Sequence, residues 1–497
     1  MRKLFLSVLS ILFLLNFTYS QITPFPEFKS TVLSSVYKIE SDNNLIGTQC
    51  IEWRSGVASY ARFYVNDKTE VIITCAEAGG NWDVSSVKPV DYIIEGNRLR
   101  ISFAESNKIM IHTDTKEVLY IFVESAEEKA LIPDNKKVFS ILDFGVKPGT
   151  EKILSFDIQN AIDVVASKGG GTLLFPAGIY KTGTISIKSK VFLYLAAGAR
   201  IQASVNKTDY PQDFGKTGSG SEMIYTRLIL FDHVTNAGIR GSGEIDGGRH
   251  TETIKESMSG ILPNLIRIRN CDNISIEGVL LRRAFGWNTH VLFSENIEIS
   301  NLKSICSGSD GMDIDNSKKV KISDVLISSH DDSFVLKSTT NRYGPPQNVT
   351  DIILNDAVLF TVKSALKIGT ETNAEKMSDI TFENITFAGS RGALVMYIRD
   401  GTTISDISYK NMTVKNSKHT IEWIIKNRNG KGKIQNITLN NIDSKEINNV
   451  ILEGLDKSHL IKNVSINDFK MNGKLLNNFD GIPGNRNRFV ENISVNF

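Results

Sequence analysis

A short phrase recurs along the second half of the chain and constrains its fold more than any other feature. Each copy reads apolar residue, any residue, apolar residue, any residue, and then Asn, Asp or Gly. The copies start at residues 274, 297, 320, 352, 380, 407, 437 and 464, so successive starts lie 23 to 32 residues apart. Because each unit can bury its apolar residues only against its neighbours, the array predicts a solenoid.

The segments between the turns indicate which kind of solenoid forms. Apolar-x-apolar segments with no helical period between them favour a β-solenoid, in which strands of adjacent coils pair in parallel about 4.8 Å apart. The recurring Asn or Asp fits a turn in which the side chain bonds to local backbone. A leucine-rich horseshoe is the alternative, but the Leu spacing does not fit it. We therefore expect an all-β fold with a right-handed parallel β-helix over residues 138–497.

A second strand recurs 14 or 15 residues after each start, and it aligns acidic residues. These strands are residues 312–314, 334–336, 366–368 and 395–397. Stacking them gives Asp310, Asp332, Ser364 and Ala393 the same position in successive coils, two residues before each strand. The register therefore predicts that Asp310 and Asp332 lie on one face in adjacent coils, with Asp331 beside them.

These three aspartates form the candidate catalytic site. Like charges this close cannot all ionise freely, so the pKa of at least one carboxyl should rise. Such a carboxyl can act as a general acid while an ionised neighbour deprotonates water, which is what an inverting glycosidase needs. The competing interpretation is that they are turn residues. Adjacent acids stacked on another acid repel one another, however, and a purely structural role does not explain why that repulsion is tolerated.

The N-terminal part of the chain differs from the repeat. Residues 1–20 have a basic start, an apolar run and small residues before the end, which predicts a signal peptide cleaved after Ser20 and a secreted or periplasmic protein. Residues 21–135 hold short alternating segments between turn residues, typical of an antiparallel β-sandwich. A boundary is expected near residues 132–135. Residues 156–165 have helical spacing and predict a helix that caps the open end of the β-helix.

Charge and cysteine content restrict the possible partners. The chain has 57 Lys and Arg against 55 Asp and Glu, and removing the two basic residues of the signal peptide leaves 55 of each. This balance does not favour nucleic-acid binding, and no later segment is apolar enough to span a bilayer. The four cysteines leave open the pairs Cys50–Cys75 and Cys271–Cys306, or free thiols. No zinc-type spacing or phosphate-binding loop occurs, so we expect no cofactor.

Several segments resemble a known family. Residues 144–147, 169–180 and 193–199 look like the entry segment of the pectinase-like β-helix hydrolases. Asp310-Gly311 and Asp331-Asp332 resemble the two acidic motifs of glycoside hydrolase family 28, the polygalacturonases. The resemblance covers about residues 138–440 and implies a single-displacement, inverting hydrolase. It makes Asp331 the general acid, with Asp310 and Asp332 holding the attacking water. The β-sandwich resembles that of family 49, the dextranase and isopullulanase group.

The chain departs from the polygalacturonase pattern where that family binds its substrate. Ser364 stands in place of the His in a Gly-His-Gly motif. The family's Arg-Ile-Lys motif, which binds the substrate carboxylate, aligns with residues 396–399, where only Arg399 is charged. We therefore expect weak or no activity on plain polygalacturonate and better activity on another polysaccharide or oligosaccharide.

Further residues near the expected cleft are candidates for substrate binding. Trp287 lies one coil before the aspartates and could stack on a sugar ring or pack in the core. His290 could replace the missing family His from an adjacent coil or be structural. Glu371 could bind a sugar hydroxyl or pair with Lys337 or Lys367. The full candidate set is Trp287, His290, Asp313, Lys337, Lys367, Glu371, Tyr397 and Arg399.

Two other functions remain open from the sequence. A polysaccharide lyase on the same fold needs a uronic acid substrate, usually a Lys or Arg base, and often calcium held by clustered Asp; Lys337 near the aspartates fits such a base. A non-catalytic glycan-binding solenoid would not need three acids in one register. Because fold does not fix function, the products decide between hydrolysis and elimination.

Overall fold

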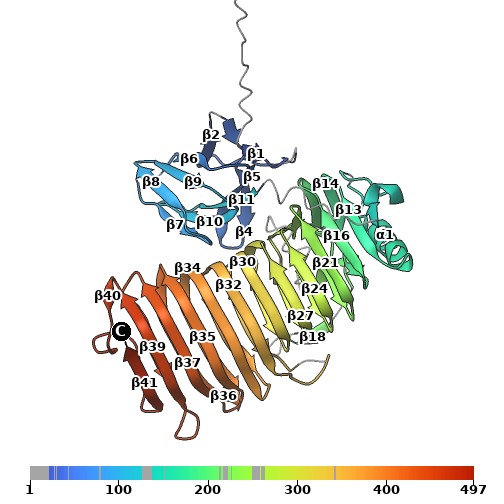
Figure 1. Cartoon of the computed structure of the whole chain (residues 1–497). Helices are drawn as coiled ribbons and strands as arrows, with labels where there is room; N and C mark the ends of the chain where they lie inside the picture. Colours follow the sequence, from blue (N-terminus) through green and yellow to red (C-terminus); the bar gives the residue numbers. More distant parts are fainter. Residues whose placement is uncertain are drawn as a thin grey trace, which may run out of the picture.

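The computed structural model shows a small β domain seated on one long β-helix (Figure 1). It describes residues 22–26, 28, 31–42, 44–77, 80–125, 137–149, 151–211, 214–216, 222–224, 226–248, 258, 263–340 and 343–496. The expected signal peptide and the expected boundary near residues 132–135 lie outside these ranges. Within them, no helix is long and apolar enough to cross a membrane.

Two sheets pack face to face in the N-terminal domain. The strand orders are β1-β5-β11-β10-β7, with β4 beside β5, and β3-β2-β6-β9-β8. The bounds are β1 (Ile22–Pro24), β2 (Tyr37–Ser41), β3 (Asn44–Ile46), β4 (Gln49–Trp53), β5 (Gly56–Val65), β6 (Thr69–Cys75), β7 (Asp83–Ser86), β8 (Asp91–Glu95), β9 (Arg98–Phe103), β10 (Asn107–His112) and β11 (Val118–Ser125). Phe63, Ile73 and Ile121 belong to the core between the sheets. The pairs are antiparallel except β5 with β11, which run parallel; alternation could not reveal this, because it fixes faces and not directions.

Most of the described residues after the sandwich form a right-handed parallel β-helix, the handedness that parallel crossovers favour. Its first strands are β12 (Val138–Ser140), β13 (Gly171–Phe175), β14 (Gly178–Thr182), β15 (Ile185–Ile187), β16 (Val191–Leu195), β17 (Ala199–Ala203), β20 (Arg227–Asp232), β21 (Thr235–Gly241), β22 (Glu244–Asp246), β23 (Asn264–Arg269), β24 (Asp272–Glu277), β25 (Leu280–Arg282), β26 (Thr289–Leu292), β27 (Glu295–Ser300) and β28 (Lys303–Ser307). A separate hairpin consists of β18 (Phe214–Lys216) and β19 (Glu222–Ile224).

The later coils carry longer strands that turn from one sheet into the next. They are β29 (Met312–Asp315), β30 (Lys318–Ser329), β31 (Phe334–Ser338), β32 (Val349–Thr361), β33 (Ser364–Thr372), β34 (Lys376–Asp400), β35 (Thr403–Val414), β36 (Ser417–Gly430), β37 (Lys433–Ser444), β38 (Asn449–Glu453), β39 (Ile461–Met471), β40 (Lys474–Leu475) and β41 (Val490–Asn496). β34, for example, pairs with β35 in one sheet and with β36 in another.

The repeat starts pair with one another from coil to coil. Ile274 pairs with Ile297, which pairs with Val320, and the column continues through residues 352, 380, 407, 437 and 464 to residue 493. These residues pack in a core that runs the length of the helix. The residue that ends each phrase has a positive φ, from 50° at Asn301 to 82° at Gly278. Asn, Asp and Gly tolerate this left-handed conformation best, which explains why they recur there.

A second column of left-handed residues directly precedes the repeat starts. Its members are Asn273, Asn296, Lys319, Asp351, Asp379, Asp406, Asn436 and Asn463. Within it, the Asn436 side chain donates to Asp406 at 3.1 Å and the Asn463 side chain donates to Asn436 at 3.1 Å. The sequence analysis did not identify this column, although the same preference for Asn and Asp marks it.

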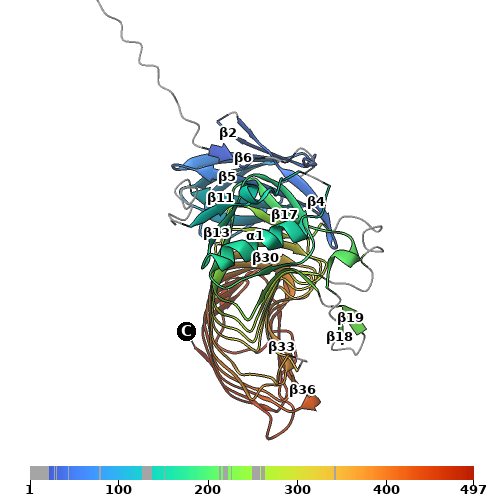
Figure 2. The ribbon, with the colours of Figure 1, turned by 90° about the vertical axis from the view of Figure 1, so that its right-hand side faces the viewer.

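One helix covers the N-terminal end of the β-helix, as the sequence predicted. α1 (Ser155–Ser167) buries Ile158, Ile162 and Val165 in the long core. Figure 2 shows α1 lying across the end of the coil. Short 3-10 helices occupy Ile141–Phe144 and Lys207–Asp209.

The structure corrects the register of one coil and shows the state of the four cysteines. Ser364 aligns with Gly392 and not with Ala393, so the expected register of this coil was wrong by one residue. Residues 393–396 are all apolar, and without alternation the sequence could not fix the register. The four cysteines are free, three of them buried, so neither open disulfide pair forms.

The sandwich and the β-helix share a buried interface beside strands β30, β32 and β34 (Figure 1). Tyr60 and Tyr120 of the sandwich pack in one cluster with apolar residues of the coils. Glu124 lies 2.7 Å from Arg62 and 3.0 Å from Lys303. Burial raises the pKa of Glu124, but these two cations outweigh burial and lower it to about 2. The interface therefore contains a buried carboxylate whose negative charge is balanced by two neighbouring cations.

Candidate active site

The three candidate aspartates lie at turns that lead into one sheet of the β-helix. Asp310 precedes β29, and Asp331 and Asp332 precede β31 one coil later. Met312 pairs with Phe334, which gives Asp310 and Asp332 the same position in adjacent coils. One oxygen of each carboxylate lies within 4.8 Å of the others. Asp310 and Asp332 are only 5% and 6% exposed, whereas Asp331 is partly exposed.

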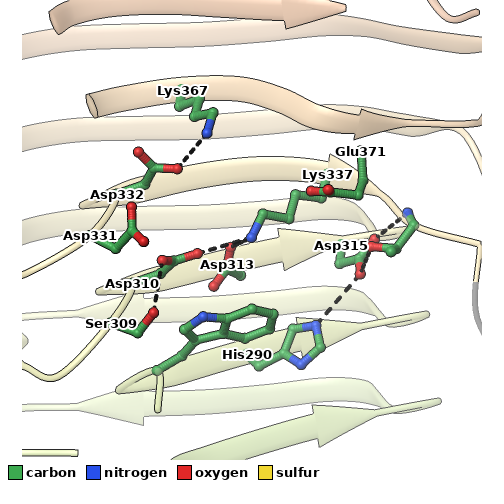
Figure 3. A network of polar contacts seen from close by, with 12 residues as sticks. His290, Ser309, Asp310, Asp313, Asp315, Asp331, Asp332, Lys337, Lys367 and Glu371 are labelled. Carbon is green, nitrogen blue, oxygen red and sulfur yellow. Dashed lines mark hydrogen bonds and ion pairs between the residues drawn. The ribbon is translucent and has the colours of Figure 1, made fainter. Parts of the chain in front are cut away.

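Two lysines neutralise the buried aspartates, and each extends from the following coil (Figure 3). Lys337 Nζ lies 2.9 Å from Asp310 Oδ2 and 2.7 Å from Asp313 Oδ1. Lys367 Nζ lies 2.5 Å from Asp332 Oδ2. The sequence named both lysines as substrate-binding candidates, but the structure places them as partners of the aspartates.

Burial is the largest influence on the pKa values of this group. It raises the pKa of Asp310, with a further rise from Asp332 and Asp331 and an opposing effect of Lys337. Burial also raises the pKa of Asp313 well above its usual value. For Lys337, burial lowers the pKa, but Asp310 and Asp313 outweigh it and raise the pKa well above its usual value. Lys337 is thus held protonated, and the lyase alternative loses its candidate base.

Asp331 differs from Asp310 and Asp332 because its carboxylate is unpaired and partly exposed, although hydrogen bonds hold its backbone in place. Its N–H donates to the Ser309 carbonyl at 3.1 Å, and its own carbonyl accepts from the hydroxyls of Thr361 and Ser329. Among the residues that the structure describes, its carboxylate has no hydrogen bond or ion pair. A fixed backbone and an unpaired, partly exposed carboxyl suit a group that reaches the substrate.

Trp287 contacts both His290 and Lys337. The rings of Trp287 and His290 meet edge-on at 4.8 Å, and Lys337 Nζ lies 4.5 Å from the Trp287 ring centroid. His290 Nε2 lies 3.6 Å from Asp315 (Figure 3). Burial lowers the pKa of His290 to about 4, so the ring is neutral near pH 7. The structure therefore places His290 beside Asp315 and away from the three aspartates.

A pocket of about 310 Å³ opens beside Asp331 and Asp332. It is lined by Asp331, Asp332, Lys363, Ser364, Lys367, Thr370, Arg391, Tyr397 and Arg399. Arg391 lies 2.8 Å from Glu422, and Tyr397 donates to the same carboxylate at 2.8 Å. In the described part of the chain, Lys363 and Arg399 have no ion pair, so they remain available to an anionic ligand.

Not every candidate substrate-binding residue reaches this pocket. Tyr397, Arg399 and Lys367 line it, whereas Trp287, His290, Asp313 and Lys337 do not. Glu371 also lies outside it and pairs at 3.6 Å with Arg428, a partner the sequence analysis did not consider.

The sequence analysis missed two basic pocket residues, Lys363 and Arg391. The register of Ser364 with Asp332 and with Gly392 gives both the same position as Asp331, one and two coils later. The predicted register of the third coil already aligned Lys363 with Asp331, and the correct register of the fourth coil would have added Arg391.

Among the residues that the structure describes, the three aspartates are the group that could hold a metal ion. Their nearest oxygens lie within 4.8 Å of one another, and carboxylates are ligands that hard cations prefer. Lys337 and Lys367 already supply positive charge to two of the three, so a cation would compete with both lysines.

The sandwich reaches the edge of this site. Arg54, at the turn between β4 and β5, donates to the Gly308 carbonyl at 2.9 Å. Ser55 at the same turn lies 2.7 Å from Nδ1 of His330, the neighbour of Asp331. The N-terminal domain therefore borders the turns that carry the aspartates.

Comparisons with known proteins identify relatives of this chain. The family model described as glycosyl hydrolases family 28 matches residues 172–480. The chain is 26% identical over 309 residues to a probable polygalacturonase of Vitis vinifera, covering 57% of this chain and 61% of the relative. It is 24% identical over 312 residues to a probable rhamnogalacturonase B of Neosartorya fischeri, covering 62% of this chain and 49% of the relative. The chain thus aligns with less than two thirds of either relative.

Solved structures show the same fold. A hyperthermoactive exopolygalacturonase from Thermotoga maritima is similar with a TM-score of 0.54 and 19% identity, covering 75% of this chain and 96% of that chain. Dex49A from Penicillium minioluteum is similar with a TM-score of 0.55 and 11% identity, covering 93% of this chain and 95% of that chain. At these identities the likeness concerns the fold alone.

Proposed function

The chain belongs to glycosyl hydrolases family 28, and on that premise we propose that it hydrolyses glycosidic bonds of a polysaccharide or oligosaccharide at Asp310, Asp331 and Asp332. The observation that carries this proposal is the group of three carboxylates in adjacent coils, with oxygens within 4.8 Å, beside a pocket with basic walls. Product analysis tests it: new reducing ends without the ultraviolet absorbance of an unsaturated sugar indicate hydrolysis. Absorbance would instead indicate the lyase alternative.

In the proposed mechanism, the open carboxyl of Asp331 protonates the leaving oxygen while the glycosidic C–O bond breaks. Asp310 and Asp332 accept hydrogen bonds from the attacking water and take its proton, and Lys337 and Lys367 stabilise their charges. A single displacement inverts the anomeric carbon. Support for inversion comes from the family resemblance and not from the spacing of the carboxylates, since the carboxyl groups of inverting enzymes are usually about 6.5–9.5 Å apart. The closer oxygens here make retention the outcome that would contradict the mechanism.

We propose that the substrate carries a uronic acid but is not plain polygalacturonate. Lys363 and Arg399 line the pocket without ion pairs among the described residues and would bind a sugar carboxylate. At the place of the Arg-Ile-Lys motif only Arg399 is charged, so plain polygalacturonate is not the proposed substrate. A panel of polygalacturonate, a rhamnogalacturonan and a neutral glucan tests this proposal by reducing-end release. Comparable turnover of polygalacturonate, or a preference for the neutral glucan, would contradict it.

The proposal extends to the rest of the chain. Residues 1–20 would direct export and be removed after Ser20, residues 21–135 would form one domain, and residues 138–497 would form the catalytic domain. N-terminal sequencing of protein recovered outside the cytoplasm tests the cleavage site: a first residue at position 21 agrees with it, and an intact N-terminus contradicts it.

A further inference from the structure

A groove of about 930 Å³ lies between the sandwich and the β-helix, next to the pocket with the aspartates. One wall includes Asn81 and Thr113 of the sandwich, and the other includes Phe360, Ser390 and Lys418 of the coils. We propose that this groove is a second sugar-binding site, which holds the part of the polysaccharide chain that extends beyond the pocket. This inference rests on the function proposed above.

The groove and the pocket share a wall. Arg391 lines both cavities. Thr361 and Val362 line the groove, and the next residue, Lys363, lines the pocket. The Thr361 hydroxyl also donates to the backbone carbonyl of Asp331. A polymer bound beside Asp331 can therefore continue into the groove without leaving the protein surface.

The groove crosses several coils in succession. Phe360 belongs to β32, Ser390 to β34 and Lys418 to β36, which are consecutive coils that pair through this region. Strands of neighbouring coils lie about 4.8 Å apart, so the three coils span about 10 Å. This length fits a short run of linked sugar rings and exceeds what a single sugar would fill.

The surface chemistry of the groove suits a carbohydrate. The rings of Phe360 and His112 contact each other at 5.0 Å, and Val362 is 46% exposed, so part of the groove is apolar. Ser390 and Lys418 add hydrogen-bond donors at its edge. Sugar rings present apolar faces bounded by hydroxyls, and binding sites with apolar walls and a few placed polar groups match them. Lys418 also favours an anionic polymer.

The groove is held in place by contacts across the domain interface. Lys415 Nζ lies 2.9 Å from Asp83 and donates to the Val84 carbonyl at 2.8 Å. Asn416 donates to the other oxygen of Asp83 at 2.6 Å. The second acid of the groove, Asp114, accepts from Asn81 at 2.8 Å. Both carboxylates are thus engaged with protein partners, and the wall is preformed for binding.

The test compares long and short substrates in the full-length protein. The probes are fragments of about eight sugars and of the shortest cleaved length, prepared from the panel polysaccharide that the wild type cleaves fastest. Val362→Glu and, separately, Lys418→Glu introduce a negative charge into the groove. We expect each variant to lose about tenfold in kcat/KM on the long fragment and to stay within about twofold on the short one. Both changes alter exposed residues, and unfolding by denaturant checks that the fold is retained.

The matched control is Ile353→Glu. Ile353 is 42% exposed and lies on β32, the same strand that leads to Val362, but it is not among the residues that line the groove. It should change neither rate. Equal losses on long and short fragments in both groove variants, or no loss on either, would overturn the second site while leaving the hydrolase intact. Failure of the wild type to cleave any panel member would instead contradict the proposed function on which the site rests.

Discussion

At the scale of single residues, the three aspartates of the site differ in their exposure and in their charged partners. Asp331 keeps an open carboxyl, whereas Asp310 and Asp332 are buried and each has its own lysine. Lys337 lies between Asp310 and Asp313, so one positive charge serves two buried carboxylates. The charge state of the site therefore depends on a residue that does not reach the pocket.

Replacing Lys337 should shift the pH dependence of activity. Burial already raises the pKa of Asp310, and Lys337 opposes that rise. Without the lysine the pKa of Asp310 rises further, so the ionised form that holds the water is lost at a higher pH. The acid limb of kcat/KM against pH should therefore move to higher pH in Lys337→Met. Lys363→Met, which removes a lysine without an ion pair, should leave the limb in place; an unmoved limb in Lys337→Met contradicts the assignment.

His290 should make the protein less stable in mild acid. Burial holds its folded-state pKa at about 4, below the value of about 6.5 in an unfolded chain. Between these two values the unfolded state binds the proton and the folded state does not, so stability falls as pH decreases through that window. The loss approaches about 3 kcal/mol near pH 4. Urea unfolding at pH 7 and pH 4.5 should show a smaller loss in His290→Gln than in the wild type; equal losses would contradict this.

At the scale of elements, the turns set the spacing of the coils. The residue that ends each repeat phrase adopts a left-handed conformation, and its side chain can bond to the coil before it. Asn441 has φ of 55° and donates to Asn411 at 2.9 Å. The recurrence of Asn and Asp thus reflects backbone geometry, whereas the aspartates of the site lie in a different column, at the turns before β29 and β31.

Substitutions at Asn441 separate the two contributions of this turn. Asn441→Ala and Asn441→Gly both remove the side-chain bond, but only Ala opposes the left-handed conformation. We expect Asn441→Ala to be less stable than Asn441→Gly by about 1 kcal/mol, because that conformation places Cβ close to the carbonyl oxygen. Equal free energies of unfolding for the two variants would contradict this reading of the repeat.

The sequence predicted the elements of this fold better than their exact registers. The phrase starting at Ile297 identified the coils, because apolar spacing and left-handed turns are local properties. The column of Asp310 and Asp332 followed from the spacing of the second strand, which begins 14 or 15 residues after each repeat start. The coil at Gly392 was misaligned because its strand is apolar throughout. Arg391 was missed for the same reason, whereas Lys363 already shared the position of Asp331 in the predicted register and was overlooked.

At the scale of the whole molecule, the sandwich is joined to the β-helix by buried charges as well as apolar contacts. Glu124 is compensated by Arg62 of its own domain and by Lys303 of the β-helix. The contacts of Arg54 and Ser55 with turns next to the aspartates bring the same domain to the edge of the site. The sandwich is therefore part of the functional surface, as the proposed groove also requires.

Breaking this interface at one charge should be costly. Lys303→Met leaves Glu124 buried with one cation instead of two, and breaking a buried ion pair typically costs about 3–5 kcal/mol. The double variant Lys303→Met/Glu124→Gln should cost less than the sum of the single variants. Lys38→Met, at an exposed pair with Glu40, should cost less than about 1 kcal/mol. Equal effects at the buried and exposed pairs, measured by denaturant unfolding, would contradict a buried interface.

The central claim is that Asp331 acts as general acid in a single-displacement hydrolysis that also uses Asp310 and Asp332. Proton NMR of the first products, followed in the wild type and in Asp331→Asn, tests it most directly. The account predicts an inverted anomeric configuration in the wild type and a rate lower by about 10²–10⁴-fold in Asp331→Asn, whose fold is retained because Asn is nearly isosteric. Asp310→Asn and Asp332→Asn should also slow the reaction, with double substitutions less than additive. Retained configuration, or near-normal rates in both Asp331→Asn and Asp332→Asn, would contradict it.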